Sequence, residues 1–280
     1  MKIFVGTLKT IENEFEECVA AIERQTYQNF EHFVFEDLPN KEAHDTLYRS
    51  FMERADEFDL MVKVDADMVI ENEVLFEGIV ERFEEHPRLQ DLEIAVHDFF
   101  SDRLIWGMHA YRDTMEWKRG DENLFVDRAE VPDEAHIQDD EDLAPAAIHC
   151  KSPSPFQAFH YGVHKALKMI QPGRWPKNRS HVRFHWKNIQ QTRDHFRRTG
   201  DRRLGYAVLG AEVGLREDIT PEHISYSEPY LRRRFDAFEN LDAEALRATV
   251  RSMSPLSLLP SPVRRRALLY RDRFQRFLSR

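Results

Sequence analysis

The sequence lacks the features that mark several classes of protein. Cysteine occurs only at Cys18 and Cys150, a spacing that suits neither a zinc motif nor a redox pair. This argues against a disulfide scaffold and favours a reducing compartment. No run of about 18 apolar residues is present, which excludes a membrane-spanning helix. Residues 1–7 turn polar too early for a signal peptide, so we expect a cytoplasmic protein.

Glycine is scarce where phosphate-binding loops usually lie. Gly6 is the only glycine before residue 78. Glycines recur at 205, 210 and 214, but these positions do not follow a predicted strand, so they are not a dinucleotide-binding fingerprint. The sequence therefore disfavours proteins that hold phosphate in a glycine-rich loop.

The composition that is present indicates a folded chain with a strong charge asymmetry. Hydrophobic residues make up 41% of the 280 positions and include 20 Phe, enough for a substantial core. Residues 1–150 carry 14 basic and 38 acidic side chains, whereas residues 151–280 carry 26 and 12. The basic half can meet phosphates or an anionic surface, or the two halves can neutralise each other within the fold.

The first 64 residues alternate between strand and helix patterns. Short apolar runs at 2–7, 33–35 and 60–64 predict strands, and helical spacing at 15–25 and 43–58 predicts the helices between them. This β-α-β-α-β order implies a parallel sheet with right-handed crossovers. The ends of all three strands then fall on one edge of the sheet, where Thr7, Asp37 and Asp65 are expected to converge.

The third strand ends on two carboxylates, in the sequence L-M-V-K-V-D-A-D-M-V-I from Leu60 to Ile70. Asp65 and Asp67 would repel each other unless a cation lies between them, and oxygen ligands suit Mg²⁺ or Mn²⁺. Such an ion usually completes its coordination with water and substrate phosphates. Two interpretations stay open from these residues alone: a metal–diphosphate site, or a solvated turn in which Asp caps backbone N–H groups.

The segment E-E-C-V-A-A-I-E-R-Q-T-Y-Q-N-F-E-H-F-V-F-E-D, followed about 30 residues later by V-D-A-D, resembles family 2-type glycosyltransferases of GT-A fold. The resemblance covers residues 1–72. It implies a mostly parallel, Rossmann-type α/β sheet flanked by helices. It also implies that Glu36 and Asp37 bind the nucleoside of a nucleotide-sugar donor. Asp65 and Asp67 would hold the ribose, the diphosphate and a divalent metal, Mn²⁺ or Mg²⁺.

Two segments of the sequence depart from the pattern of that family. After the first strand the chain reads T-L-K-T, from Thr7 to Thr10, instead of a P-T-Y-N-like segment. The second strand ends in Glu36-Asp37-Leu38-Pro39 instead of two Asp followed by Gly and Ser. The nucleotide pocket is therefore expected to differ from the family's, and among donors a UDP-sugar is favoured.

Three later residues are candidates for the chemistry. Asp98 follows a strand pattern and is a candidate acceptor contact or general base, or else a turn Asp. Asp142, in the acidic run of residues 130–142, is a second candidate base, or part of a solvated loop. The resemblance makes His149 a candidate third metal ligand, whereas a lone His is more often structural. The adjacent Cys150 is expected to be buried rather than to bind metal.

The carboxyl-terminal part is expected to be separate from the transferase domain. We place that domain at residues 1–220 and a helical, basic extension at 221–280. Within it, residues 263–280 combine an apolar stripe with six arginines, which are Arg264, Arg265, Arg266, Arg271, Arg273 and Arg276. Such a helix can dock on the acidic half of the chain or on a second subunit, or lie on the inner face of a membrane.

Together these features predict an enzyme that moves a sugar from a nucleotide-sugar donor to a hydroxyl acceptor on a sugar, lipid or protein, in glycan or glycoconjugate synthesis. The sequence leaves open whether the stereochemistry is inverted or retained. Two alternatives remain: a non-catalytic scaffold that binds a partner through its arginine-rich tail, and a sugar nucleotidyltransferase. Nucleic acid is not expected as a partner, because the basic residues form no known reading module.

Overall fold

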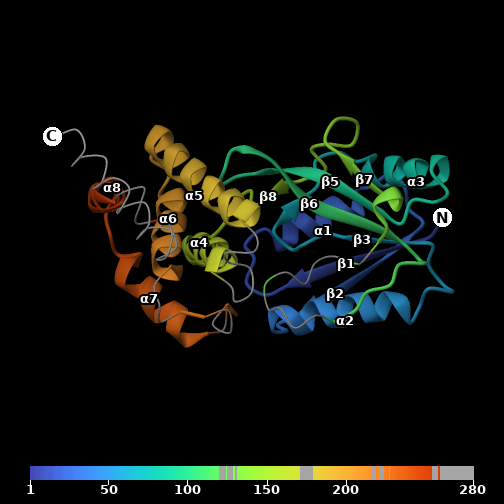
Figure 1. The fold of residues 1–280 in the computed structure, drawn as a ribbon, viewed down its shortest axis with the longest axis horizontal. Helices are drawn as coiled ribbons and strands as arrows, with labels where there is room; N and C mark the ends of the chain where they lie inside the picture. Colours follow the sequence, from blue (N-terminus) through green and yellow to red (C-terminus); the bar gives the residue numbers. More distant parts are fainter. Residues whose placement is uncertain are drawn as a thin grey trace, which may run out of the picture. The chain divides into compact units, whose positions relative to one another are not determined.

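The computed structural model describes residues 1–119, 124, 129, 131–170, 179–215, 219–220, 224–226, 228–253 and 258. The chain forms two compact units, Met1–Ser154 and Pro155–Arg280 (Figure 1). Unit 1 contains the sheet and unit 2 is helical among its described residues.

Unit 1 is a mixed α/β structure. Its helices are α1 (Phe15–Glu23), α2 (Asn40–Met52) and α3 (Leu75–Glu85), with a short 3-10 turn at Asp133–Ala135. Its strands are β1 (Ile3–Lys9), β2 (Phe30–Glu36), β3 (Leu60–Lys63), β4 (Met68–Val69), β5 (Asp91–Asp98), β6 (Arg103–Arg112), β7 (His136–Asp139) and β8 (Ile148–His149). They form one sheet in the order β2-β1-β3-β6-β5-β8-β4, and β7 pairs with β5 outside this path.

The sheet is mixed, which corrects the expectation of a mostly parallel sheet. The amino-terminal part agrees with the sequence, because β1 pairs in parallel with both β2 and β3. However, β6 runs antiparallel to β3 and to β5. Only residues 99–102 separate β5 from β6, and so short a connection permits antiparallel pairing alone.

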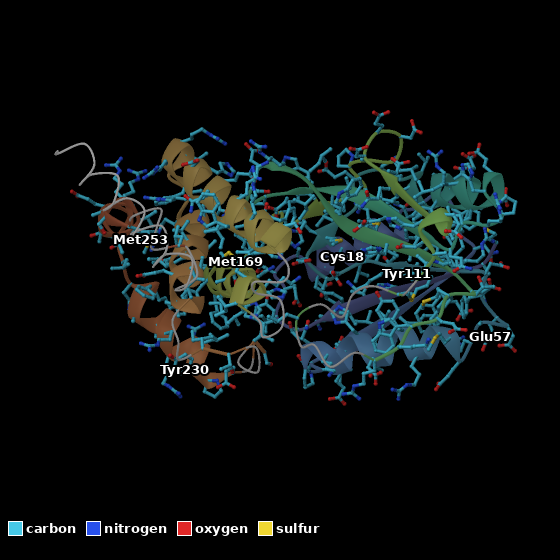
Figure 2. The ribbon with its side chains drawn as sticks, viewed as in Figure 1. Cys18, Glu57, Tyr111, Met169, Tyr230 and Met253 are labelled. Atoms are coloured by element: carbon cyan, nitrogen blue, oxygen red, sulfur yellow. The ribbon has the colours of Figure 1, made fainter. Side chains whose placement is uncertain are left out.

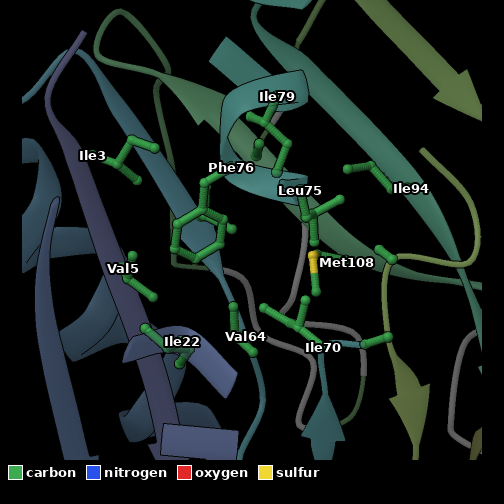
Figure 3. Packing of buried hydrophobic residues seen from close by; sticks show 14 of the residues in the cluster. Ile3, Val5, Ile22, Val64, Ile70, Leu75, Phe76, Ile79, Ile94 and Met108 are labelled. Atoms are coloured by element: carbon green, nitrogen blue, oxygen red, sulfur yellow. The ribbon is translucent and has the colours of Figure 1, made fainter. Parts of the chain in front are cut away.

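Helices cover both faces of this sheet. On one face, α1 and α3 bury Cys18, Ile22, Phe76 and Ile79 in a core with alternate strand residues such as Val5 (Figure 3). On the other face, α2 packs through Leu47 and Phe51 against Phe4 and Met61. Every residue of β3 is buried because the strand is central and covered on both faces. This explains the continuous apolar run before Asp65.

Unit 2 contains α4 (Pro155–Ile170), α5 (Arg179–Thr199), α6 (Arg202–Gly214), α7 (Pro229–Glu239) and α8 (Ala243–Ser252). Figure 2 shows its side chains, with Met169, Tyr230 and Met253 labelled. Glycines at the contact between helices α4 and α6 allow the two helices to pack closely. A Cβ atom at Gly162 would lie 1.8 Å from the carbonyl oxygen of Ala207, and one at Gly210 would lie 1.9 Å from that of Phe159.

The helical unit begins at Pro155, so the boundary expected near residue 220 falls inside it. Helices α7 and α8 provide the described part of the expected helical extension. The arginine-rich segment 263–280 lies outside the described residues. Among the helices that the structure describes, none is long and apolar enough to cross a membrane.

Candidate metal centre at the edge of the sheet

Backbone pairing assembles the candidate site in unit 1. The chain leaves β3 after Lys63 and enters β4 directly after Asp67. β4 pairs antiparallel with β8, which places Met68 opposite His149. β8 also pairs in parallel with the end of β5, which places His149 opposite Asp98. Three predicted site residues that are distant in sequence, Asp67, Asp98 and His149, therefore lie together.

Asp67 is the centre of this cluster. Its Oδ2 accepts a hydrogen bond from the Cys150 thiol at 3.1 Å and lies 3.4 Å from Nε2 of His149. The backbone N–H of Cys150 donates to the carbonyl oxygen of Asp67 at 2.7 Å. The other carboxylate oxygen, Oδ1, is buried, and no described residue donates to it. Asp67 thus has an oxygen whose lone pairs remain available for a ligand.

Asp98 orients His149 from behind. Its Oδ1 lies 2.8 Å from Nδ1 of His149, and its Oδ2 accepts bonds from the backbone N–H of Ser101 at 2.8 Å and from the Ser101 hydroxyl at 2.6 Å. The Asp98 side chain is fully buried. The bond at Nδ1 turns Nε2 towards Asp67. Metal-binding imidazoles commonly have their other ring nitrogen bonded to a carboxylate in this way, which fixes the orientation of the ring.

The charges of the cluster compensate one another. Burial disfavours the ionised form of Asp67, but His149, the Cys150 hydrogen bond and Lys63 outweigh it and lower the pKa of Asp67 to about 2. Burial likewise disfavours the imidazolium form of His149, but Cys150, Asp67 and Asp98 together outweigh it and raise the pKa of His149 well above its ordinary value. Asp67 is therefore a carboxylate at neutral pH, as a metal ligand must be, whereas His149 would have to release a proton to bind a metal.

Asp65 has a different environment from Asp67. Nζ of Lys63 donates to both of its carboxylate oxygens, at 2.6 and 2.7 Å. Lys63 is itself 4% exposed, so this is a largely buried cation beside a partly exposed acid. The two acids of D-A-D were expected to need a cation between them. In this structure Lys63 compensates Asp65, and His149 compensates Asp67.

Asp67, His149 and Cys150 fit a divalent metal. Each offers one ligand atom, and these atoms all lie within 4.8 Å of one another. They supply one carboxylate oxygen, one imidazole nitrogen and one sulfur, which are the donor types that proteins use for transition metals. Asp65, which the sequence placed in the same ligand set, is bonded to Lys63 instead.

Cys150, His149 and Asp98 also have the order of a thiol-based catalytic triad, but the details oppose that role. Sγ lies 3.6 Å from Nε2 of His149 and bonds to Asp67 at the shorter distance of 3.1 Å. Burial and the Asp67 carboxylate raise the pKa of the Cys150 thiol well above its usual range. A nucleophilic cysteine needs a lowered pKa and an accessible sulfur, whereas this residue is 2% exposed.

The predicted nucleoside-binding residues lie at the ends of β1 and β2. Glu36 is exposed and bonded to Lys9 at 3.2 Å, and Asp37 follows it with a φ of 55°. Few non-glycine residues adopt this left-handed conformation, although Asp does so more readily than most. Thr7 is fully buried, and its hydroxyl lies 2.9 Å from Nε2 of His32. Glu36 and Asp37 are thus accessible to a ligand, whereas Thr7 is engaged within the sheet.

Asp142, the second candidate base, lies outside the described contacts of the cluster. It is exposed and forms an ion pair with Arg82 in the last turn of α3, at 2.8 Å. Arg82 also binds Asp139 at 3.0 Å. The assignment of Asp142 as a base stays a prediction.

Two charged residues near the site have roles that the sequence analysis did not assign. Lys63 interrupts the apolar run two residues before Asp65, and this alternation signals that both side chains lie on the same face. Glu12, in the loop after β1, bonds to the Thr10 hydroxyl at 2.7 Å. Burial, aided by the charge of Asp67, raises the pKa of Glu12 to about 7. No motif marks Glu12, because its environment arises only from the fold.

No protein-family model matches the sequence, and no curated protein matches it. Among solved structures, the chain is similar to the mannosyltransferase PcManGT from Pyrobaculum calidifontis in complex with GDP-Man and Mn²⁺. The TM-score is 0.35 and the identity 11%, over 94% of this chain and 86% of that one. It is also similar to A197 from STIV, with a TM-score of 0.32 and 10% identity, over 40% of this chain and 65% of that one. At these scores the two structures support no inference about the activity of this chain.

Proposed function

We propose that this protein is a metal-dependent glycosyltransferase that uses a nucleotide-sugar donor, with a UDP-sugar favoured, and a hydroxyl acceptor. The observation that carries the proposal is the cluster of Asp67, His149 and Asp98. It lies after the carboxyl end of β3. The exposed acid Glu36 ends β2 and the exposed Asp37 follows it, at the same end of the parallel strands. Ligands of open α/β sheets bind outside this edge.

Each residue has a distinct part in the proposed reaction. Asp67 and His149 would hold the metal, which neutralises charge on the leaving diphosphate. Asp98 fixes the ring of His149, so it acts through that residue rather than on substrate. Glu36 and Asp37 would bind the nucleoside, and Lys63 forms an ion pair with Asp65. Asp142 is retained as the proposed base for an inverting reaction.

One observation favours a second candidate, a non-catalytic scaffold that keeps the fold. Lys63 and His149 already compensate Asp65 and Asp67 within the chain, so the carboxylates do not require a metal for charge balance. A protein that had lost its donor would retain the same ion pairs. Binding experiments separate this alternative from the enzyme.

The test is thermal unfolding with Mn²⁺ and UDP, GDP, ADP or CMP, each with and without metal. A ligand at 100 times its Kd stabilises the folded state by about 2.7 kcal/mol. We expect one nucleotide to raise Tm by several degrees only when metal is present. Asp67→Asn should abolish the rise, whereas Asp140→Asn, which removes an exposed acid of the acidic loop, should preserve it. If no nucleotide raises Tm, the scaffold is the better account.

A further inference from the structure

We propose that Cys150 is the third protein ligand of the metal centre, so that the site prefers borderline metals such as Zn²⁺ and Co²⁺ to Mg²⁺. The inference rests on the proposed metal site and changes its selectivity. Nothing in the sequence pattern marks Cys150 as a ligand, and its burial was the expected property. The argument comes from three features of the structure.

The first feature is the spacing of the ligand atoms. Nε2 of His149 lies 3.4 Å from Oδ2 of Asp67 and 3.6 Å from Sγ of Cys150, and Sγ lies 3.1 Å from the same oxygen. Tetrahedral zinc with bonds of about 2.0–2.3 Å places neighbouring ligand atoms roughly 3.3–3.7 Å apart. Octahedral Mg²⁺, with bonds of about 2.1 Å at right angles, places them about 3.0 Å apart. Two of the three distances match the tetrahedral arrangement.

The second feature is the backbone of Cys150. Its φ is 54°, a left-handed conformation that residues other than glycine seldom adopt. The turn brings both the backbone N–H and the thiol of one residue onto Asp67. Such conformations persist when the surrounding structure enforces them, and they are concentrated at functional sites.

The third feature is the polar environment of the sulfur. A buried cysteine that serves only for packing needs no polar neighbour. Cys150 instead lies against a carboxylate that has a second, unsatisfied oxygen and against an imidazole held in place by Asp98. The other cysteine, Cys18, belongs to the hydrophobic core of the same unit, and among the described residues its thiol donates only to a backbone group, the carbonyl oxygen of Asp65, at 3.7 Å. When metal binds, the Cys150 thiol and the His149 imidazolium would each release a proton to solvent. The electron pair left on Sγ would form the sulfur–metal bond, and the lone pair of Nε2 would form the nitrogen–metal bond.

The test is a titration of the metal-free protein with Co²⁺ alone, followed by absorption spectroscopy. A thiolate ligand produces an intense near-ultraviolet charge-transfer band, and tetrahedral Co²⁺ absorbs visible light far more strongly than octahedral Co²⁺. We expect both signals to saturate at one Co²⁺ per chain. Cys150→Ser should remove the charge-transfer band and weaken Co²⁺ binding by at least about 100-fold, the upper end of what loss of an outer-shell partner costs. It should change Mg²⁺ binding much less.

Cys18→Ala is the matched control, since it removes the other cysteine and should leave the band intact. Circular dichroism shows whether each variant is folded. Binding of Co²⁺ without the band, or a band that survives in Cys150→Ser, would overturn the role of Cys150 and leave the metal site standing. Failure of wild type to bind Co²⁺ would overturn both the ligand assignment and the metal centre.

Discussion

Each end of β5 carries a cluster of acidic residues and histidine. The two clusters differ in whether every carboxylate oxygen has a partner. At the start of the strand, Asp91 lies 3.1 Å from His109 and 2.9 Å from His136, and Glu93 lies 3.5 and 3.7 Å from the other nitrogens of the same rings. Gln138 also donates to Glu93 at 2.7 Å. Every carboxylate oxygen of this ring has a nitrogen partner.

At the other end of β5, the cluster of Asp67, Asp98, His149 and Cys150 is incomplete, because Oδ1 of Asp67 has no described donor. The contrast distinguishes a structural network from a binding site. A closed ring of acids and imidazoles satisfies itself and holds β5, β6 and β7 together. In the open cluster, Asp98 holds His149 in place, but one oxygen of Asp67 has no described donor. Such a cluster is suited to bind an external ligand.

The largest expected effect follows from breaking the closed ring. His109→Ala removes one imidazole and leaves two buried carboxylates short of a partner. Leaving a buried polar group without its partner costs about 1–3 kcal/mol, and here two carboxylates are affected. Urea unfolding should show this loss, while Co²⁺ affinity per folded molecule should stay within a factor of about three. A large drop in metal affinity would show that the two clusters are not independent.

The second prediction concerns a buried histidine that has no acidic partner among the residues that the structure describes. His160 in unit 2 donates to the carbonyl oxygen of Ile224 and stacks on Tyr226. Burial lowers the pKa of His160 to about 4, although the carbonyl bond acts in the opposite sense. The unfolded chain therefore binds more protons between pH 6.5 and 4, so this contribution to stability is present above pH 6.5 and is lost as pH falls to 4.

The loss attributable to His160 should reach about 3 kcal/mol, from roughly 1.4 kcal/mol per pKa unit. Unfolding free energies of wild type and His160→Gln, measured at several pH values, isolate it, because the carboxylates titrate alike in both proteins. The variant should be less stable at pH 7 and should lose less stability on acidification. Parallel pH curves for the two proteins would contradict the prediction.

The next largest effect is expected at Asp98, which holds His149 of the open cluster in place. Asp98→Asn keeps the shape of the side chain but replaces the carboxylate that orients His149. Such outer-shell changes cost about 10–100-fold in metal affinity. Titration with Co²⁺ should show this loss while the sulfur charge-transfer band is retained at saturation, because Cys150 is unchanged. Unaltered affinity would mean that Asp98 does not position the metal-binding imidazole.

The smallest effect is expected at an acid outside both clusters. Asp142 is exposed and pairs with Arg82 at 2.8 Å. Exposed ion pairs contribute about 0–1 kcal/mol, so Asp142→Asn should barely change stability or metal affinity. Calorimetry and Co²⁺ titration check both quantities. If stability fell by several kcal/mol, Asp142 would have to belong to a buried network after all.

The sequence predicted the parts of this structure that depend on local pattern. Apolar runs ending on polar residues indicated β1, β2 and β3 and their parallel pairing. The D-A-D spacing placed Asp67 beyond a buried strand end. The helix predicted over residues 43–58 ends at Met52. Phe58 therefore lies outside the helix, but it is buried in the same core as the apolar residues of that helix.

The remaining features depend on contacts between distant segments, which a local pattern does not specify. Asp98 and His149 are 51 residues apart, and their contact requires β8 to pair with the end of β5. The antiparallel pairing of β6 with β5 follows from the short connection at residues 99–102, which carries no strong sequence signal. Likewise, Cys150 offered no motif, because its position beside Asp67 results from the pairing of β8 with β4 and from the left-handed backbone of Cys150 itself.

The pairing of Asp67 with Cys150 has a mechanical consequence. The two residues are 83 positions apart, and between them the chain forms α3, β5, β6 and β7. A metal bound to both would act as a removable cross-link that closes this long loop, much as a disulfide does in an oxidising compartment. Removing the metal with a chelator would then open this cross-link and also take away the Lewis acid. Hydrogen exchange in β4 and β8 should therefore report metal occupancy even when no sugar is transferred.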